Sequence, residues 1–228
     1  MQLLILVLIF CLVVFLFSLH VLAKEDLIFV RKNVTLEALF NLAFYTAGVG
    51  LLSSRIVYLI LHPSRGFFNP LVFFLFPYFP GLSLVGGIAG ATAFVFAYRR
   101  KKLPNGRIFD FFAMALLASL PFGFFGYELL NNFADLFVGI LLPIIYIVML
   151  LFFVKVLLPL NIRGEIQDGS LGFFFLLIFS FTNLLAKFVR TKNWLTILTQ
   201  VDVILLVLLF IAALVILILQ EREHHFSK

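Results

Sequence analysis

The stretch that decides the fold of this chain is Pro80-Gly81-Leu82-Ser83-Leu84-Val85-Gly86-Gly87-Ile88-Ala89-Gly90. Pro80 ends any helix that arrives from the apolar residues before it, and Ser83 is a favoured N-cap for a new one. The new helix stays apolar as far as Tyr98. Its length, roughly 22 Å, is less than the ~30 Å of a bilayer core. We therefore expect its first turn to lie inside the membrane.

The glycines of this stretch have two interpretations. Gly86 and Gly90 have the spacing of a packing face, at which another helix approaches the backbone closely. The amides at the start of a helix are also a suitable site for a phosphate, and non-helical backbone at membrane depth is tolerated where it lines a cavity. On this second interpretation Ser83, Gly86 and Gly87 bind a lipid headgroup. The sequence leaves both interpretations open.

The composition is that of an integral membrane protein. Hydrophobic residues make up 64% of the 228 residues and charged residues only 12%, which excludes a soluble domain. Cys11 is the single cysteine, so the chain has no internal disulfide and no cysteine metal cluster. The histidines show no zinc-ligand spacing. We expect no metal and no other cofactor.

Apolar runs predict an all-helical transmembrane bundle of about seven spans, in a single domain of residues 1–228. The run from Leu3 lacks a basic n-region and is followed directly by Lys24, so we interpret it as a retained span rather than a signal peptide. A shorter apolar piece at 71–79 is expected to be re-entrant or interfacial. The predicted spans cover residues 3–23, 36–61, 84–98, 108–130, 135–160, 170–187 and 199–219.

The distribution of Lys and Arg predicts an N-terminus outside and a C-terminus in the cytoplasm. In that orientation twelve basic residues fall in cytoplasmic segments and four in outer ones. The net charge of +6 then reflects membrane topology, and we expect no nucleic-acid partner. The outer four are Arg65, Lys187, Arg190 and Lys192; the cytoplasmic twelve are Lys24, Arg31, Lys32, Arg99, Arg100, Lys101, Lys102, Arg107, Lys155, Arg163, Arg222 and Lys228.

Polar residues collect at the predicted outer ends of the spans. Arg55 lies within the second span and Glu128 near the end of the fourth. A charge inside a span costs at least about 2.5–3.5 kcal/mol on insertion scales, so we expect Arg55 and Glu128 to pair. A structural ion pair and a functional one both remain open. The same ends also hold Asn183, Lys187, Arg190, Lys192, Gln200 and Asp202.

The basic residues near 190 also have two interpretations. Lys187, Arg190 and Lys192 are placed to snorkel onto lipid phosphates from the end of a span. Together with Arg55, they are equally suited to an outer-leaflet cavity for an anionic headgroup.

The order and spacing of these residues resemble the prolipoprotein diacylglyceryl transferases of bacterial membranes. Residues 51–58 resemble the family stretch Gly-x-Arg-Ile-x-Tyr, and residues 81–90 resemble Gly-Gly-x-Ser-x-His-Gly-Gly-Leu-x-Gly. Residues 119–128 fall on the signature Gly-Arg-Ile-Gly-Asn-Phe-Ile-Asn-Gly-Glu. Residues 179–190 fall on Tyr-Gly-x-x-Arg-Phe-x-x-Glu-Phe-x-Arg, and residues 195–200 resemble Leu-Thr-x-x-Gln with one extra residue.

Several polar positions of the family are retained and others are replaced. The retained ones are Arg55, Glu128 and Arg190. The family histidine falls on Val85, and the arginine and first asparagine of the central signature fall on Leu120 and Gly123. Further along, Asn183 stands for an arginine and Lys187 for a glutamate.

The resemblance implies a multi-pass protein of the bacterial inner membrane. The implied activity is transfer of the diacylglyceryl group of phosphatidylglycerol to the lipobox cysteine of a prolipoprotein, which forms a thioether. The implied partners are therefore phosphatidylglycerol or another anionic phospholipid, and a lipobox segment. The implied catalytic residues are Arg55, Glu128 and Arg190, and the expected lipid-binding residues are Ser83, Gly86, Gly87, Asn183, Lys187 and Gln200.

Two other functions fit the sequence. One is a non-catalytic protein on the same scaffold that binds lipid or stabilises an assembly. The other, a small transporter, fits less well, because the polar residues gather at one face instead of marking a path through the membrane midplane.

The predicted topology can be tested with reporters. A reporter fused after Lys228 and a tag at Asn105 should both read cytoplasmic, whereas tags at Ser64 and Lys192 should read external. Reporter-fusion and cysteine-accessibility assays measure this directly. Tags at Asn105 and Lys192 that report from the same side would contradict the seven-span topology.

Overall fold

The structure is a computed structural model that describes residues 2–24, 26–32, 34–62, 81–98, 104–130, 137–190 and 201–227. Over these ranges it is all-helical, as predicted. Six of the described helical segments are long and apolar enough to cross a membrane, and a shorter apolar helix accompanies them. The predicted re-entrant piece at 71–79 lies outside the described residues, and the orientation in the membrane stays a prediction.

The helices follow one another with few interruptions. In chain order they are α1 (Gln2–Lys24), α2 (Leu27–Arg31), α3 (Leu36–Leu61), α5 (Leu84–Ala97), α6 (Asn105–Leu130), η2 (Phe137–Leu141), α7 (Leu142–Phe152), η3 (Phe153–Leu157), α8 (Leu158–Ile162), α9 (Ser170–Arg190) and α11 (Val201–Ser227).

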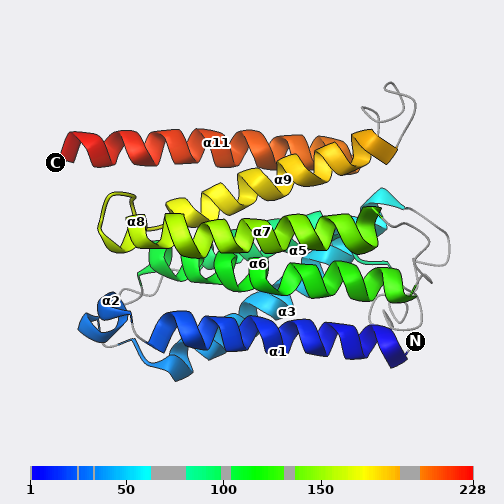
Figure 1. The fold of residues 1–228 in the computed structure, drawn as a ribbon, viewed down its shortest axis with the longest axis horizontal. Helices are drawn as coiled ribbons and strands as arrows, with labels where there is room; N and C mark the ends of the chain where they lie inside the picture. The colour runs from blue at the N-terminus through cyan, green and yellow to red at the C-terminus, as the bar shows by residue number, and fades with distance from the viewer. Residues whose placement is uncertain are drawn as a thin grey trace.

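The long helices lie side by side along one axis, with the two termini at opposite ends (Figure 1). We call the end at which α1 begins the N-terminal end of the bundle, and the end at which α11 finishes the C-terminal end. Helix α11 continues as far as Ser227, beyond the apolar run that ends at Leu219. Beyond that run, Gln220 and Glu221 form hydrogen bonds to residues of the segment 167–170 at the C-terminal end.

Helix α6 forms the centre of the bundle. It packs against α1, α7 and α9, while α3 packs mainly against α5 and α11 against α9. Its buried residues run along most of its length, from Ile108 through Phe111 and Met114 to Leu117 and Leu120. Many apolar side chains on the outer faces of the other helices are exposed, as expected of surfaces that contact lipid.

Ser83 caps α5 as predicted. Its hydroxyl accepts a hydrogen bond from the amide of Gly86 at 3.2 Å, and its carbonyl accepts one from Gly87 at 2.9 Å. The amide of Ser83 donates to the carbonyl of Ser54 at 3.2 Å, which fixes the start of α5 against α3. A cap satisfies backbone donors that would otherwise be costly to bury in an apolar environment.

The segment 137–162 differs from the uninterrupted span that the sequence predicts. Two π-helical turns, η2 and η3, precede α7 and α8, and each of those helices has a proline within its first two positions. The ring of a proline crowds the carbonyl four residues earlier. For Pro143 and Pro159 that carbonyl belongs to Gly139 and Lys155, and both lie in the π turns. The wider turns accommodate the prolines without ending the helix.

The close contact between α3 and α5 depends on glycine, and a substitution at Gly86 tests this dependence. A Cβ added at Gly86 would lie 2.5 Å from Cβ of Val57, an atom that cannot move without its backbone. We expect Gly86→Ala to lower the free energy of unfolding by about 1–3 kcal/mol, the usual cost of overpacking. Thermal or denaturant unfolding in detergent measures this.

Gly48→Ala in α3 is the matched control, because nothing lies within 4 Å of the added Cβ. It should leave stability unchanged or raise it by up to about 1 kcal/mol through helix propensity. Equal stability of Gly86→Ala and the wild type would show that the α3–α5 contact does not depend on the missing side chain.

Candidate functional site

The candidate site residues of the sequence analysis that the structure describes lie towards the N-terminal end of the bundle. Figure 1 shows that α3, α6 and α9 finish at this end, where α5 and α11 begin. Arg55 is near the end of α3, Glu128 near the end of α6, and Asn183 and Lys187 near the end of α9. Arg190 closes α9, and Gln200 and Lys192 lie outside the described residues.

Arg55 is a buried arginine inside a membrane helix, with only 2% of its surface exposed. Its Nη1 donates to the carbonyl of Gly81 at 2.7 Å, and its guanidinium lies 6.0 Å from the ring centroid of Tyr58. Gly81 has a positive φ of 156°, and a side chain there would collide with the Tyr58 ring. Arg55 therefore contacts the backbone just before α5, two residues from the N-cap Ser83.

Glu128 provides a second buried charge near this end, with 2% of its surface exposed on α6. Burial of a carboxylate is costly unless it is paired or hydrogen-bonded, so this position is consistent with a charge partner in the bundle. The pairing of Glu128 with Arg55 stays a prediction.

The glycines of α5 serve the contact with α3. Gly87 lies against the carbonyl of Gly50 and the side chain of Ser54, both 3.3 Å from a built Cβ. At Gly90 an added Cβ would collide with the side chain of Ser53. The amides of Gly86 and Gly87 already donate to Ser83. These contacts favour the packing interpretation of the glycines over phosphate binding by their amides.

Asn183 and Lys187 connect α9 to its neighbours. The amide of Asn183 donates to the hydroxyl of Tyr146 at 2.9 Å and to the carbonyl of Phe179 at 2.8 Å. Lys187 Nζ forms an ion pair with Asp202 on α11 at 3.1 Å, and about a third of each side chain is exposed. An ion pair this exposed contributes at most about 1 kcal/mol to stability. Both side chains are therefore accessible from outside the bundle.

A larger polar network lies at the C-terminal end of the bundle, and our sequence analysis did not anticipate it. Arg107, in the first turn of α6, donates to Oδ2 of Asp26 from both Nε (3.0 Å) and Nη2 (2.8 Å). Both side chains are about 5% exposed or less. Oδ1 of the same aspartate accepts the amides of Ile28 and Phe29 and so caps α2. One carboxylate thus joins α2 to α6.

Two more carboxylates extend this network to α9 and α11. Asp110 accepts the amides of Gly169 at 2.7 Å and Gly172 at 2.8 Å, so a side chain of α6 caps the start of α9. Glu221 accepts the hydroxyl of Ser170 at 2.5 Å and the amide of Gln167 at 3.4 Å. The carboxylates of Asp26, Asp110 and Glu221 all accept hydrogen bonds from protein donors, so this network stabilises the packing of the helices.

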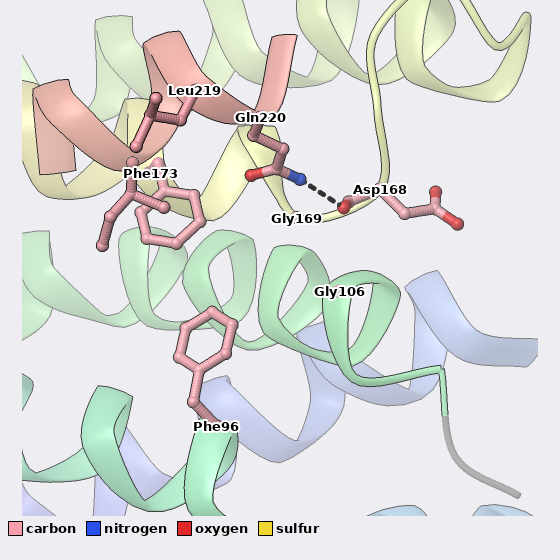
Figure 2. A pocket seen from close by; sticks show the side chains of 8 residues that line it. Phe96, Gly106, Asp168, Gly169, Phe173, Leu219 and Gln220 are labelled. Atoms are coloured by element: carbon pink, nitrogen blue, oxygen red, sulfur yellow. Dashed lines mark hydrogen bonds between the residues drawn. The ribbon is translucent and has the colours of Figure 1, made fainter. Parts of the chain in front are cut away.

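A cavity of about 320 Å³ lies beside this network, between α5, α6, α9 and α11. Phe96 and Phe173, whose rings are stacked with centroids 5.6 Å apart, line it together with Gln220, which donates to the carbonyl of Asp168 at 2.7 Å (Figure 2). The carboxylate of Asp168 is directed away from the two rings (Figure 2) and lies 3.3 Å from Nη1 of Arg107. Asp168 and Gln220 are the polar side chains among its lining residues, and the others are apolar or glycine.

The sequence did contain one signal for this network. Arg107 and Asp110 are three residues apart in α6, so both charges face the same side of an apolar helix. Their partners could not be read from spacing, because Asp26 is 81 residues from Arg107. Among the described residues no group of three or more His, Cys, Asp or Glu has the arrangement of a metal site.

Comparisons with known proteins identify no relative of this chain. No protein-family model matches this chain, and no curated protein and no solved structure matches it.

The Arg107–Asp26 ion pair gives a quantitative prediction. Arg107→Ala leaves a buried carboxylate uncompensated and should lower the free energy of unfolding by about 3–5 kcal/mol. Asp26→Ala should cost a similar amount, and the double variant should cost less than the sum of the two. Unfolding of the four proteins in mixed micelles measures the coupling energy.

The Lys187–Asp202 pair is the matched control for this cycle. Because it is partly exposed, its coupling energy should stay below about 1 kcal/mol. Additive losses at Arg107 and Asp26 would contradict the proposed link between α2 and α6.

Proposed function

We propose that this polytopic helical membrane protein holds the phosphate of an anionic phospholipid at the N-terminal end of the bundle, as a divergent diacylglyceryl transferase-like protein. The observation that carries the proposal is the burial of Arg55. Its guanidinium lies on the membrane helix α3 and donates to Gly81, just before the start of α5. Intramembrane charges are costly, and where they occur they usually serve binding or transport. A guanidinium also has the geometry to bind two phosphate oxygens at once.

The reaction that fits this site is transfer of diacylglyceryl from phosphatidylglycerol to the lipobox cysteine of a prolipoprotein. The cysteine sulfur forms a bond to the glycerol carbon of the lipid, and the bond from that carbon to the phosphate oxygen breaks. Glycerol phosphate leaves, and the thiol proton is transferred to Glu128, to solvent or to the leaving phosphate. Negative charge grows on that phosphate during the step, so a preorganised cation there stabilises the transition state.

The retained residues take distinct roles in this proposal. Arg55 and Arg190 neutralise the phosphate, and Lys187 assists by leaving Asp202. Glu128 orients Arg55 or accepts the thiol proton. General-base assistance typically contributes about 10²–10⁴-fold, so a chain with Val85 at the position of the family histidine would be slow rather than inactive. A bacterial inner membrane supplies both the lipid and the acceptor.

A second candidate function is favoured by the polar contacts already described. The amides of Gly86 and Gly87 donate within the cap of α5, Asn183 donates to Tyr146, and Lys187 pairs with Asp202. Residues engaged in this way stabilise the bundle. They support the alternative of a lipid-binding or assembly-stabilising protein without catalysis.

One experiment separates these functions. Purified protein in nanodiscs is given labelled phosphatidylglycerol and a lipobox peptide, and both lipid binding and thioether product are measured. Arg55→Lys keeps the charge but loses bidentate binding, so it should weaken phosphatidylglycerol binding by roughly tenfold. Arg163→Lys, in an exposed loop at the C-terminal end, is the matched control and should bind normally.

The outcomes of this experiment are distinct. Product that is lost in Arg55→Lys supports the transferase, and Val85→His should then raise its rate. Binding without product supports the non-catalytic function. Equal binding of phosphatidylglycerol and a zwitterionic lipid, unchanged by Arg55→Lys, would reject the phosphate site altogether.

A further inference from the structure

A separate group of polar side chains lies on the outer face of α3, towards the C-terminal end of the bundle. A cavity of about 310 Å³ is lined there by Thr35, Glu37, Ala38, Asn41, Tyr45 and Tyr98. It lies between the first turns of α3 and the end of α5, at the opposite end of these helices from Arg55. Nothing in the proposed transferase reaction uses these residues.

Three of the lining residues form a polar stripe on a membrane helix. Glu37, Asn41 and Tyr45 are spaced four residues apart and so lie on one face of α3. All three are exposed, and Tyr45 is 60% exposed. The side chains of these three residues make no hydrogen bond or ion pair with any other described residue. The hydroxyl of Thr35, in contrast, is occupied by the amide of Ala38 at 3.2 Å.

The stripe begins in the first turn of a membrane span, which is the part of the span nearest the headgroups. Glu37 to Tyr45 covers roughly 12 Å of helix, measured from the start of a membrane span. Tyrosine alone at this level is common, because its ring sits well at the interface. A carboxylate and a carboxamide in the same cavity need a further explanation, because polar groups at a lipid surface require hydrogen-bond partners.

We propose that this cavity binds the headgroup of a phospholipid that carries a primary ammonium, such as phosphatidylethanolamine. Glu37 is the one charged residue among the described residues that line the cavity, and its carboxylate accepts hydrogen bonds from the ammonium. The amide of Asn41 and the hydroxyl of Tyr45 donate to the phosphate oxygens. This arrangement disfavours an anionic headgroup, so the cavity differs in selectivity from the phosphate site at Arg55.

The headgroup chemistry provides a sharp test. A quaternary ammonium has no N–H to donate, whereas a primary ammonium donates three hydrogen bonds. Native mass spectrometry of the protein in an equal mixture of phosphatidylethanolamine and phosphatidylcholine, with identical acyl chains, measures which lipid is retained. We expect the wild type to retain the ethanolamine lipid roughly tenfold better, as a charge-assisted hydrogen bond predicts.

Variants of Glu37 then identify the group responsible. Glu37→Gln should reduce the preference to near equality, whereas Glu165→Gln, in the exposed loop before α9, should leave it unchanged. In an equal mixture of phosphatidylethanolamine and phosphatidylglycerol, Glu37→Lys should retain phosphatidylglycerol better, because the charge in the cavity is reversed. Tyr45→Phe should lower retention of the ethanolamine and choline lipids by similar factors, because both lipids carry the phosphate.

Glu37 also complements the N-terminal dipole of α3, and that role alone predicts a different result. A purely structural Glu37 would alter the unfolding temperature of Glu37→Gln without altering its choice of lipid. Equal retention of the two lipids by the wild type, or an unchanged preference in Glu37→Gln, would overturn the proposal.

Discussion

The buried ion pair between Arg107 and Asp26 is the interaction on which the arrangement of the helices most depends. In lipid, apolar surfaces gain little by leaving one apolar environment for another, so packing and polar contacts decide which helices associate. Arg107 joins α6 to α2, and Asp110, one turn further along α6, caps α9. Glu221 then connects the segment before α9 to α11. The central helix is therefore linked to α2 and α9 through charges in its first two turns, while most of its remaining buried side chains are apolar.

The two ends of the bundle differ in how completely their polar groups are engaged. At the C-terminal end the carboxylates of Asp26, Asp110 and Glu221 each accept two or more hydrogen bonds within the protein. At the N-terminal end the Lys187–Asp202 pair is partly exposed, and Arg55 is buried next to a short helix. Carboxylates thus bind several segments together at the C-terminal end, whereas the Lys187–Asp202 ion pair at the described N-terminal end is partly exposed.

The sequence was sufficient to predict the helices and the cap of α5, because apolar runs and the Pro80–Ser83 pattern are local signals. It was not sufficient for the partners of the charges. Lys187 and Asp202 were both assigned to one end, yet their pairing depends on the angle between α9 and α11. Arg107 was counted only as a basic interfacial residue. Its partner Asp26 lies 81 residues earlier in the chain, before α3 and α5. The π turns before Pro143 and Pro159 were missed for a related reason: proline indicates that a helix must adjust and leaves the kind of adjustment open.

The shortness of α5 has a consequence for the membrane around it. Its 14 residues cover about 21 Å, roughly 9 Å less than a typical hydrocarbon core. A bilayer meets such hydrophobic mismatch by thinning locally, at a cost of fractions of a kcal/mol per Å. Leu84 at the start of α5 is exposed, whereas Phe96 near its end packs against the rings of Phe109 and Phe173. Local thinning beside α5 would bring the lipid phosphates closer to the depth of Arg55 without any movement of the protein.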